Sequence, residues 1–186
     1  MVRIISGTAR GRKIETREGL ETRPTLDRVK EAIFGSVQFL VPYAAVLDLF
    51  SGSGNLGLEA VSRGASLAVL NDRDAQCAAI IRKNAETLGF SDRVRITNLD
   101  WTAAIDRLCQ DGQSFDLAFL DPPYREGISE AAVAMLFERG LIRRDGLVIL
   151  EHAAELAPQG KPGVYRVRRS KKFGRCGYSL IEEDRE

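Results

Sequence analysis

From residue 44 onward the chain alternates between two patterns of apolar and polar positions. Short, almost wholly apolar runs occur at 46–50, 67–70, 117–120 and 147–150, with a shorter one at 94–96. Stretches with apolar residues three or four positions apart lie between them, at 56–63, 75–88, 102–109 and 128–139. The short runs are typical of strands covered on both faces, and the periodic stretches are typical of helices. The alternation predicts a doubly wound α/β fold with a mostly parallel sheet.

The first part of the chain follows another pattern. Residues 3–5 and 12–16 are short candidate strands separated by glycines, which predicts a small β-hairpin. A helix is expected from residue 25 to about residue 40. We therefore treat residues 1–40 as an N-terminal extension.

The last part of the chain predicts a second hairpin. Residues 164–170 and 178–182 read as strands on either side of a basic segment that contains glycine. We expect them to form a C-terminal antiparallel hairpin that closes the sheet. This hairpin belongs to the main domain, residues 41–186.

Composition narrows the class of protein. The chain has 186 residues, three cysteines and one histidine. The cysteines are widely spaced and form no CxxC pair, so we expect no metal site. No apolar run approaches the roughly 20 residues that span a bilayer, and the start lacks the apolar stretch of a signal peptide. We expect no membrane association and a reducing, cytoplasmic location.

Charge is unevenly distributed, although the net charge is only +1. Residues 1–14 and 158–178 contain no Asp or Glu, whereas residues 41–157 are acidic overall. The two acid-free segments are either solvated ends or a surface for a polyanion such as RNA. The candidate RNA-binding residues there are Arg10, Arg12, Lys13, Lys171 and Lys172.

A glycine-rich turn follows the first apolar run. Asp48 precedes Ser51, Gly52 and Gly54, and Gly57 completes a G-x-G-x-x-G spacing. Ligands of open parallel sheets bind at the carboxyl ends of the strands, and glycine lets a ligand approach the backbone. An acidic residue here would repel a pyrophosphate but suits the ammonium of a methionine group. The turn therefore favours S-adenosylmethionine over a dinucleotide.

Further acidic residues follow the next two predicted strands. Asp72 comes about twenty residues after Gly52, where a carboxylate can accept hydrogen bonds from both hydroxyls of a ribose. Asp72 could instead cap the next helix, but Asp74 is the better candidate for that cap. Asp100 is a candidate for the adenine amino group and equally for a helix cap. Trp101 could cover the adenine ring.

The segment Asp121-Pro122-Pro123-Tyr124 ends the apolar run at 117–120. The exocyclic amine of a base is a poor nucleophile because its lone pair is delocalised into the ring. The Asp121 carboxylate and the Pro122 carbonyl can each accept one N–H of such an amine and orient its lone pair. Tyr124 offers a flat face for stacking a base turned out of its helix. The motif predicts methylation of an exocyclic amino group.

With these motifs the chain resembles the RsmD-type family of 16S ribosomal RNA guanine-N2 methyltransferases. The resemblance covers nearly the whole chain and includes residues 3–7 and 10–13, the segment 22–34, the glycine turn, Asp121 to Arg125, Glu151-His152 and residues 171–174. The segment 22–34, which contains Arg23, is the part most specific to the family. Arg23 is therefore added to the candidate RNA-binding residues.

The resemblance implies a seven-stranded methyltransferase fold, a flipped guanine and a substrate assembled as a small ribosomal subunit. The chain departs from the family pattern by Asp72 in place of Glu and by Asn55 in place of Ala. A buried, hydrogen-bonded role is expected for His152. The alternatives are an adenine-N6 methyltransferase, a protein-glutamine methyltransferase and a ribosome-assembly factor without activity.

Overall fold

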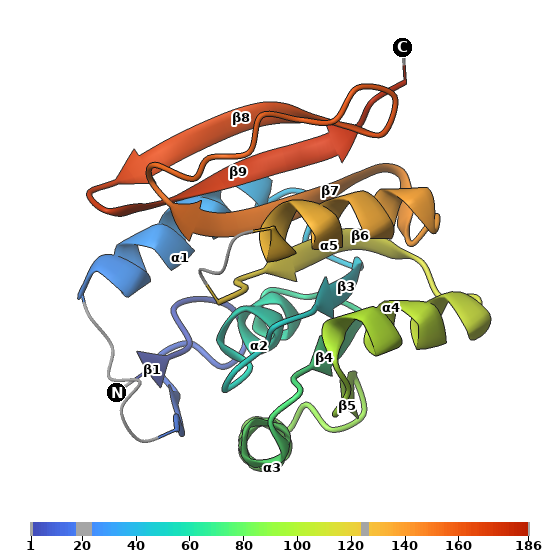
Figure 1. The fold of residues 1–186 in the computed structure, drawn as a ribbon. Coiled ribbons are helices and arrows are strands. Elements are labelled where there is room, and N and C mark those ends of the chain that lie inside the picture. Colours follow the sequence, from blue (N-terminus) through green and yellow to red (C-terminus); the bar gives the residue numbers. More distant parts are fainter. Residues whose placement is uncertain (1, 18–23, 124–126, 186) are drawn as a thin grey trace.

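A computed structural model describes residues 2–17, 24–123 and 127–185 of the chain. One seven-stranded sheet has the order β5-β4-β3-β6-β7-β9-β8 (Figure 1). Strands β5, β4, β3, β6 and β7 are parallel, whereas β9 runs antiparallel to both of its neighbours. The strands are β3 (Ala45–Asp48), β4 (Leu67–Asn71), β5 (Val94–Thr97), β6 (Phe115–Leu120), β7 (Ile142–Ala153), β8 (Tyr165–Phe173) and β9 (Cys176–Glu183).

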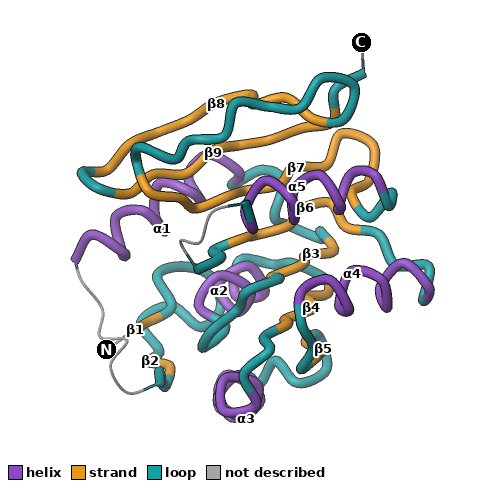
Figure 2. Tube along the Cα trace, in the orientation of Figure 1, coloured by secondary structure: helices purple, strands orange, loops and turns teal. Residues whose placement is uncertain are grey.

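Helices cover both faces of this sheet (Figure 2). They are α1 (Pro24–Val37), α2 (Asn55–Ser62), α3 (Ala75–Leu88), α4 (Trp101–Gln110) and α5 (Ile128–Glu138). Val46 packs in one core cluster with buried residues of α1, α2 and α3, and its neighbour Leu47 packs with α4 and α5. Successive residues of a strand point to opposite faces, so each buried strand supplies both clusters. The predicted doubly wound seven-stranded fold with a C-terminal antiparallel hairpin is confirmed.

Several element bounds differ from the sequence prediction. Strand β7 extends past the apolar run 147–150 because its last residues pair with β9. Helix α1 ends at Val37 rather than near residue 40, and residues 38–40 form a turn. The strands of the N-terminal hairpin, β1 (Val2–Arg3) and β2 (Lys13–Ile14), are shorter than expected.

The N-terminal hairpin packs on the main domain. Ile4 and Ile14 are buried in the same core cluster as α1 and α2. The buried Glu59 carboxylate on α2 accepts hydrogen bonds from the backbone N–H groups of Ile5 and Ser6, and Lys30 lies 3.0 Å from it. Together with hydrogen bonds from Thr8 N and Ala9 N to Ser62, these contacts hold the hairpin along α2. No helix in the described ranges is long and apolar enough to cross a membrane.

Candidate active site

The candidate site lies at the carboxyl ends of β3 and β6. Strand β3 pairs with β4 on one side and with β6 on the other. The chain leaves β3 toward β4 and returns on the far side at β6, so the connections diverge between β3 and β6. Such a switch point is where open α/β sheets bind their ligands.

The glycines in and after the turn that follows β3 have two different roles. Gly54 begins α2 with a left-handed φ of 84°, and a Cβ at Gly57 would lie 2.8 Å from the Leu70 side chain. These two glycines let α2 pack closely on β4, and neither of them lines a cavity of the site. Gly52, with φ 55°, differs because a Cβ there would meet no atom within 4 Å. Gly52 therefore leaves open space beside its backbone.

A larger cavity of about 470 Å³ lies next to Gly52. Its wall includes Asp72, Asp100 and Trp101, the residues predicted to hold the adenosine part of a cofactor. The complete lining is Arg17, Leu49, Phe50, Gly52, Asn71, Asp72, Arg73, Asp74, Cys77, Leu99, Asp100, Trp101, Asp121, Pro123 and Ile128. The cavity therefore brings the ends of β3, β4 and β6 together with the start of α4.

Backbone N–H groups hold the carboxylates of this larger cavity. Asp72 accepts from Gly52 N at 2.8 Å and from Asp74 N at 2.9 Å. Asp74 caps α3 through Gln76 N, as predicted. Asp100 caps α4 by accepting from Thr102 N and Oγ1, so the cap proposed as its alternative role is present. These Thr102 hydrogen bonds lower the pKa of Asp100 from its usual value.

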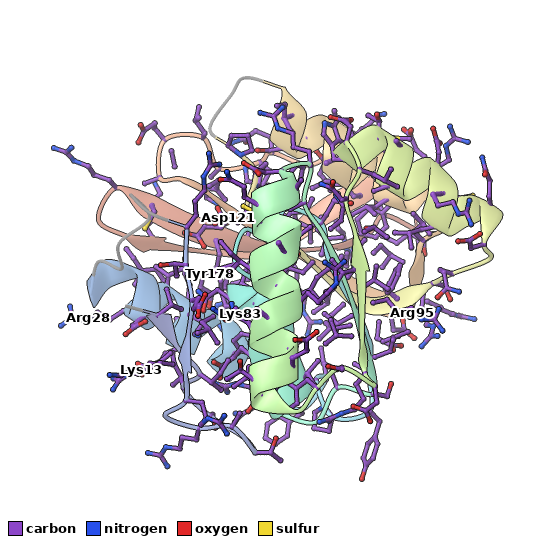
Figure 3. All side chains as sticks on the ribbon, turned by 90° about the horizontal axis from the view of Figure 1, so that it is seen from below. Lys13, Arg28, Lys83, Arg95, Asp121 and Tyr178 are labelled. Carbon is purple, nitrogen blue, oxygen red and sulfur yellow. The ribbon has the colours of Figure 1, made fainter. Side chains whose placement is uncertain are left out.

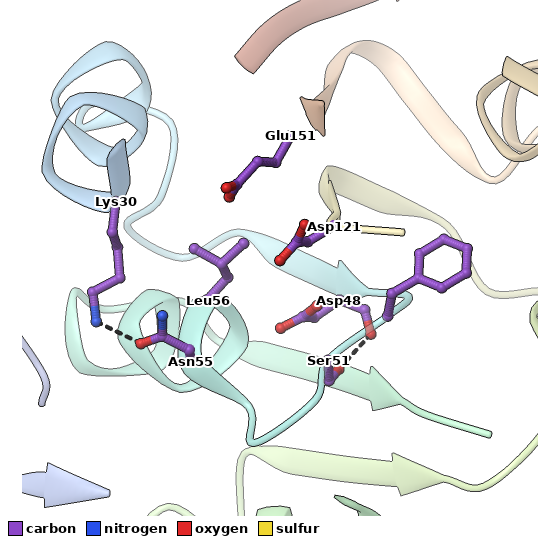
Figure 4. A pocket seen from close by; sticks show the side chains of 8 residues that line it. Lys30, Asp48, Ser51, Asn55, Leu56, Asp121 and Glu151 are labelled. Atoms are coloured by element: carbon purple, nitrogen blue, oxygen red, sulfur yellow. Dashed lines mark hydrogen bonds between the residues drawn. The ribbon is translucent and has the colours of Figure 1, made fainter. Parts of the chain in front are cut away.

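A smaller cavity of about 90 Å³ lies on the other side of Asp121 (Figure 4). Phe50 and Asp121 line both cavities, so the two adjoin at these side chains. The smaller cavity is lined by Lys30, Asp48, Phe50, Ser51, Asn55, Leu56, Asp121 and Glu151. It therefore brings three carboxyl groups together, from β3, from the end of β6 and from β7.

The surroundings of these three carboxyl groups disfavour their ionised forms. Burial raises the pKa of Asp48 to about 7, although Asp48 accepts a hydrogen bond from Gly57 N at 2.8 Å. Desolvation also raises the pKa values of Asp121 and Glu151, and the charge of Asp121 adds to the shift at Glu151. Asp121 itself is exposed, and it lies where the two cavities meet. A positive charge in this cavity would stabilise all three anions.

The other residues predicted for the site differ in their positions. Ser51 Oγ donates to the Asp48 carbonyl at 2.6 Å, which braces the turn from inside the smaller cavity. Pro122 follows Asp121 and is buried, and Pro123 is exposed in the larger cavity. Tyr124 and Arg23 lie outside the described residues.

Two of the candidate RNA-binding residues lie at the same end of the sheet as the cavities. Lys171 and Lys172 are in β8, and through β9 they align with Glu151 and His152 of β7. The turn of the N-terminal hairpin instead contacts Ser62, the last residue of α2, and so lies away from the cavities. Lys13 and Arg28 appear at one edge of the molecule, and Arg95 appears at the opposite edge (Figure 3).

The basic side chains of the hairpin differ in their contacts. Arg10, Arg12 and Lys13 are exposed. Arg12 donates to Thr87 O at the end of α3, at 2.7 Å. Within the described ranges, Arg10, Lys13, Lys171 and Lys172 form no ion pair.

The prediction for His152 is confirmed. Its side chain is buried, with Nε2 2.8 Å from Ser179 Oγ and Nδ1 2.8 Å from the Ala153 carbonyl. Because the carbonyl only accepts, Nδ1 carries the proton and Nε2 accepts from the serine. Both ring nitrogens are therefore occupied inside the sheet.

Two residues of the site were not assigned from the sequence. Glu151 enters the smaller cavity from β7. The sequence feature that could have identified it is its position at the end of an apolar run, which it shares with Asp121. Lys30 of α1 is only 2% exposed and donates to Asn55 Oδ1 at 2.7 Å and to Arg3 O at 2.8 Å. The asparagine that departs from the family pattern is thus the partner of a buried lysine.

Comparison with known proteins identifies the family. The family model described as Conserved hypothetical protein 95 matches residues 2–182. The chain belongs to this family. Ribosomal RNA small subunit methyltransferase D of Escherichia coli strain K12 is 34% identical over 183 residues, which cover 98% of this chain and 90% of that protein. The resemblance recognised from the motifs is confirmed, and the chain is a member of a methyltransferase family.

Other members agree in length and in fold. The methyltransferase D of Haemophilus influenzae is 33% identical over 97% of this chain and 93% of that protein. The solved Escherichia coli structure of yhhF has a TM-score of 0.86 at 34% identity and covers 100% of this chain and 99% of that one. The family fold therefore extends over the whole chain, including the N-terminal hairpin and the β8–β9 hairpin. No cluster of His, Cys, Asp or Glu suited to a metal ion occurs in the part of this family member that the structure describes.

Proposed function

We propose that this protein transfers a methyl group from S-adenosylmethionine to the exocyclic N2 of a guanine in 16S ribosomal RNA. The substrate is the small ribosomal subunit or one of its assembly intermediates, which a cytoplasmic enzyme meets. The observation that carries the proposal is the meeting of two acidic cavities at Asp121. The names of the E. coli and H. influenzae relatives support a substrate in small-subunit RNA.

The larger cavity fits an adenosine. Asp72 is already oriented by two backbone N–H groups, and its remaining lone pairs can accept from ribose hydroxyls. Trp101 can cover the adenine ring, and Asp100 can accept from the adenine amino group. The open space beside Gly52 lets the ligand reach the backbone.

The smaller cavity fits a cation. Its three carboxyl groups would repel the pyrophosphate of a dinucleotide, and they would stabilise an ammonium or sulfonium charge. Asp48 is the candidate partner for the ammonium of the methionine group. Bound S-adenosylmethionine supplies a methyl group that its sulfonium charge already activates, so no metal is needed.

Asp121 and Pro122 position the nucleophile in this proposal. Each accepts one N–H of the guanine N2 amine, which turns the nitrogen lone pair toward the methyl group. Nitrogen becomes positive as the new bond forms, so the ionised Asp121 carboxylate stabilises the transition state more than the ground state. The nitrogen then gives one proton to the Asp121 carboxylate, which passes it to solvent, and S-adenosylhomocysteine leaves. Tyr124 is proposed to stack on the flipped base.

The basic residues Arg10, Arg12, Lys13, Arg23, Lys171 and Lys172 are proposed to contact RNA phosphates. We further propose that residues 1–40 act as an RNA-binding extension of the catalytic domain, residues 41–186. Contacts from Lys171 and Lys172 would hold the ribosomal substrate over the end of the sheet where the cavities open. The phosphate contacts of both chain ends would weaken with added salt.

Methyl-labelled S-adenosylmethionine and small subunits from cells that lack this gene test the proposal. After incubation, nucleoside analysis of the 16S RNA should find the label in N2-methylguanosine, at one mapped position. Label in N6-methyladenosine would overturn the guanine assignment. Absence of label from RNA, with normal cofactor binding, would support an assembly factor without activity.

A further inference from the structure

Glu151 occupies a position equivalent to that of Asp121 on the neighbouring strand. Leu120 of β6 and Leu150 of β7 are partners in the parallel register, and Asp121 and Glu151 directly follow them. Neighbouring strands lie about 4.8 Å apart. Leu120 and Leu150 both pack toward α4 and α5, so the next residues point to the opposite face, beside α1 and α2. The two carboxyl groups therefore enter the smaller cavity side by side.

The Glu151 carboxyl group has no protein partner within the described ranges. The residue is 6% exposed and lines the cavity, but it accepts no hydrogen bond from another described side chain or backbone N–H. Figure 4 shows its carboxyl group pointing into the space bounded by Lys30, Leu56 and Asp121. Buried carboxylates in folded proteins are normally paired. An unpaired one that faces a cavity therefore points to a ligand with a donor at this place.

The bases differ in the atom beside the exocyclic amine. In guanine, N2 is flanked by the N1–H donor. In adenine, N6 is flanked by N1, which is an acceptor, and in cytosine N4 is flanked by N3, also an acceptor. Two carboxylates side by side therefore match guanine, because one takes the amine and the other takes N1–H.

We infer that Glu151 accepts a hydrogen bond from N1–H of the target guanine while Asp121 holds the N2 amine, so that Glu151 selects guanine among the bases with an exocyclic amine. This inference rests on the proposed function and adds the residue that determines its base specificity. Lys30 does not compete for Glu151, since its ammonium is held by Glu59, Asn55 and the Arg3 carbonyl.

The charge of Glu151 depends on what fills the cavity. In the free protein, burial and the neighbouring Asp121 charge raise the pKa of Glu151 above its usual value. A cation bound beside Asp121 offsets that charge and lowers the pKa again. The bound cofactor therefore prepares Glu151 as an acceptor, which links base selection to cofactor binding.

Replacing the target guanine by 2,6-diaminopurine tests this role. That base keeps the 2-amino group but carries an acceptor instead of a donor at N1. Small subunits reconstituted with either base at the mapped nucleotide would be compared in single-turnover methylation. The wild-type protein should methylate guanine at least about tenfold faster, and Glu151→Gln should reduce that preference by about tenfold, since one charge-assisted hydrogen bond is removed. The glutamine amide can donate to the acceptor at N1 of diaminopurine.

The exposed Glu155 provides a matched control. Glu155→Gln removes a nearby carboxylate outside the cavity and should keep the wild-type preference. Cofactor affinity and melting temperature check that Glu151→Gln folds. An unchanged preference in folded Glu151→Gln would overturn the inference. If that variant does not fold, equal wild-type rates on both bases would overturn it. If the wild-type protein methylates neither base, the proposed function fails, and the inference fails with it.

Discussion

The carboxylates of the two cavities differ in their hydrogen bonds and in their pKa values. In the larger cavity, Asp72, Asp74 and Asp100 each accept at least one backbone N–H. In the smaller cavity only Asp48 accepts a backbone N–H, from Gly57. Asp121 and Glu151 accept no hydrogen bond from another described residue, and desolvation raises both of their pKa values. The first group is fixed before any ligand arrives and suits neutral donors such as hydroxyls. The ionised forms of the second group are unfavourable until a positive charge enters the cavity. Methyl transfer from a sulfonium to an amine supplies such a charge.

The largest expected effect follows from changing Asp121, where the cavities meet. Asp121→Ala should lower the single-turnover methylation rate on the order of a hundred- to a thousandfold, because the interaction it removes is strongest in the transition state. Cofactor affinity should largely survive. Asp121→Asn keeps the shape and one acceptor oxygen and should retain weak activity. A rate for Asp121→Ala above about a third of wild type would leave Pro122 alone as the positioning group.

Changing Asp72 tests the larger cavity. Asp72→Ala should weaken cofactor binding by about 1.5–3 kcal/mol, or roughly 10- to 100-fold, because it removes charged hydrogen bonds to the ribose. Asp72 also holds the Gly52 and Asp74 N–H groups, so part of this effect reflects a less ordered turn. Asp74→Ala, which removes the α3 cap and the ion pair with Arg17, is the control for helix stability. Wild-type affinity of Asp72→Ala in calorimetry would remove Asp72 from the cofactor site.

The basic residues test the surface around both cavities. Arg10→Glu with Lys13→Glu, or Lys171→Glu with Lys172→Glu, should weaken binding to small subunits and leave cofactor affinity unchanged. The salt slope of binding should fall by roughly one for each phosphate that the variant no longer neutralises. Arg95→Glu, at the opposite edge in Figure 3, is the matched control. If neither double variant changes the salt slope more than this control does, the two chain ends are not the RNA surface.

The smallest expected effect concerns stability and pH. The pKa of Asp48 is raised from 3.8 to about 7 in the folded protein, so the fold favours the protonated form. The favourable contribution of protonated Asp48 is therefore present at about pH 4 and is lost as pH rises through about 7. Asp48→Asn should remove this loss and raise the melting temperature of the free protein at pH 8, by about 2–4 °C per kcal/mol relieved. Asp48→Asn should also bind the cofactor more weakly than the wild-type protein does. Thermal unfolding at pH 5 and pH 8 checks the sign, and an equal effect at both values would contradict it.

The sequence predicted most of the fold because its signals are local. The helix at 75–88, which Gly89 caps, was predicted with the bounds that the structure gives, and the apolar run 117–120 lies within β6. The end of β7 was missed because pairing with β9, and not the apolar pattern, determines it. Within the site, Asp48, Asp72 and Asp121 could be predicted since each directly follows or ends a strand.

The remaining parts of the site depend on contacts between distant segments. Lys30 reaches the smaller cavity only because α1 packs over α2, and its partners Glu59 and Asn55 lie far away in the sequence. Glu151 follows the same rule of position as Asp121, but it has no proline motif to mark it. The division into two cavities required the register of β6 against β3 and β7.

The structure of the protein bound to S-adenosylhomocysteine tests the division between the two cavities most directly. The account predicts the adenosine in the larger cavity, with its ribose hydroxyls on Asp72, and the amino-acid ammonium in the smaller cavity beside Asp48. The sulfur should then face the Asp121 carboxylate and leave the space before Glu151 free for a base. An amino-acid group that points away from Asp48, or adenosine that fills the space before Glu151, would contradict the account.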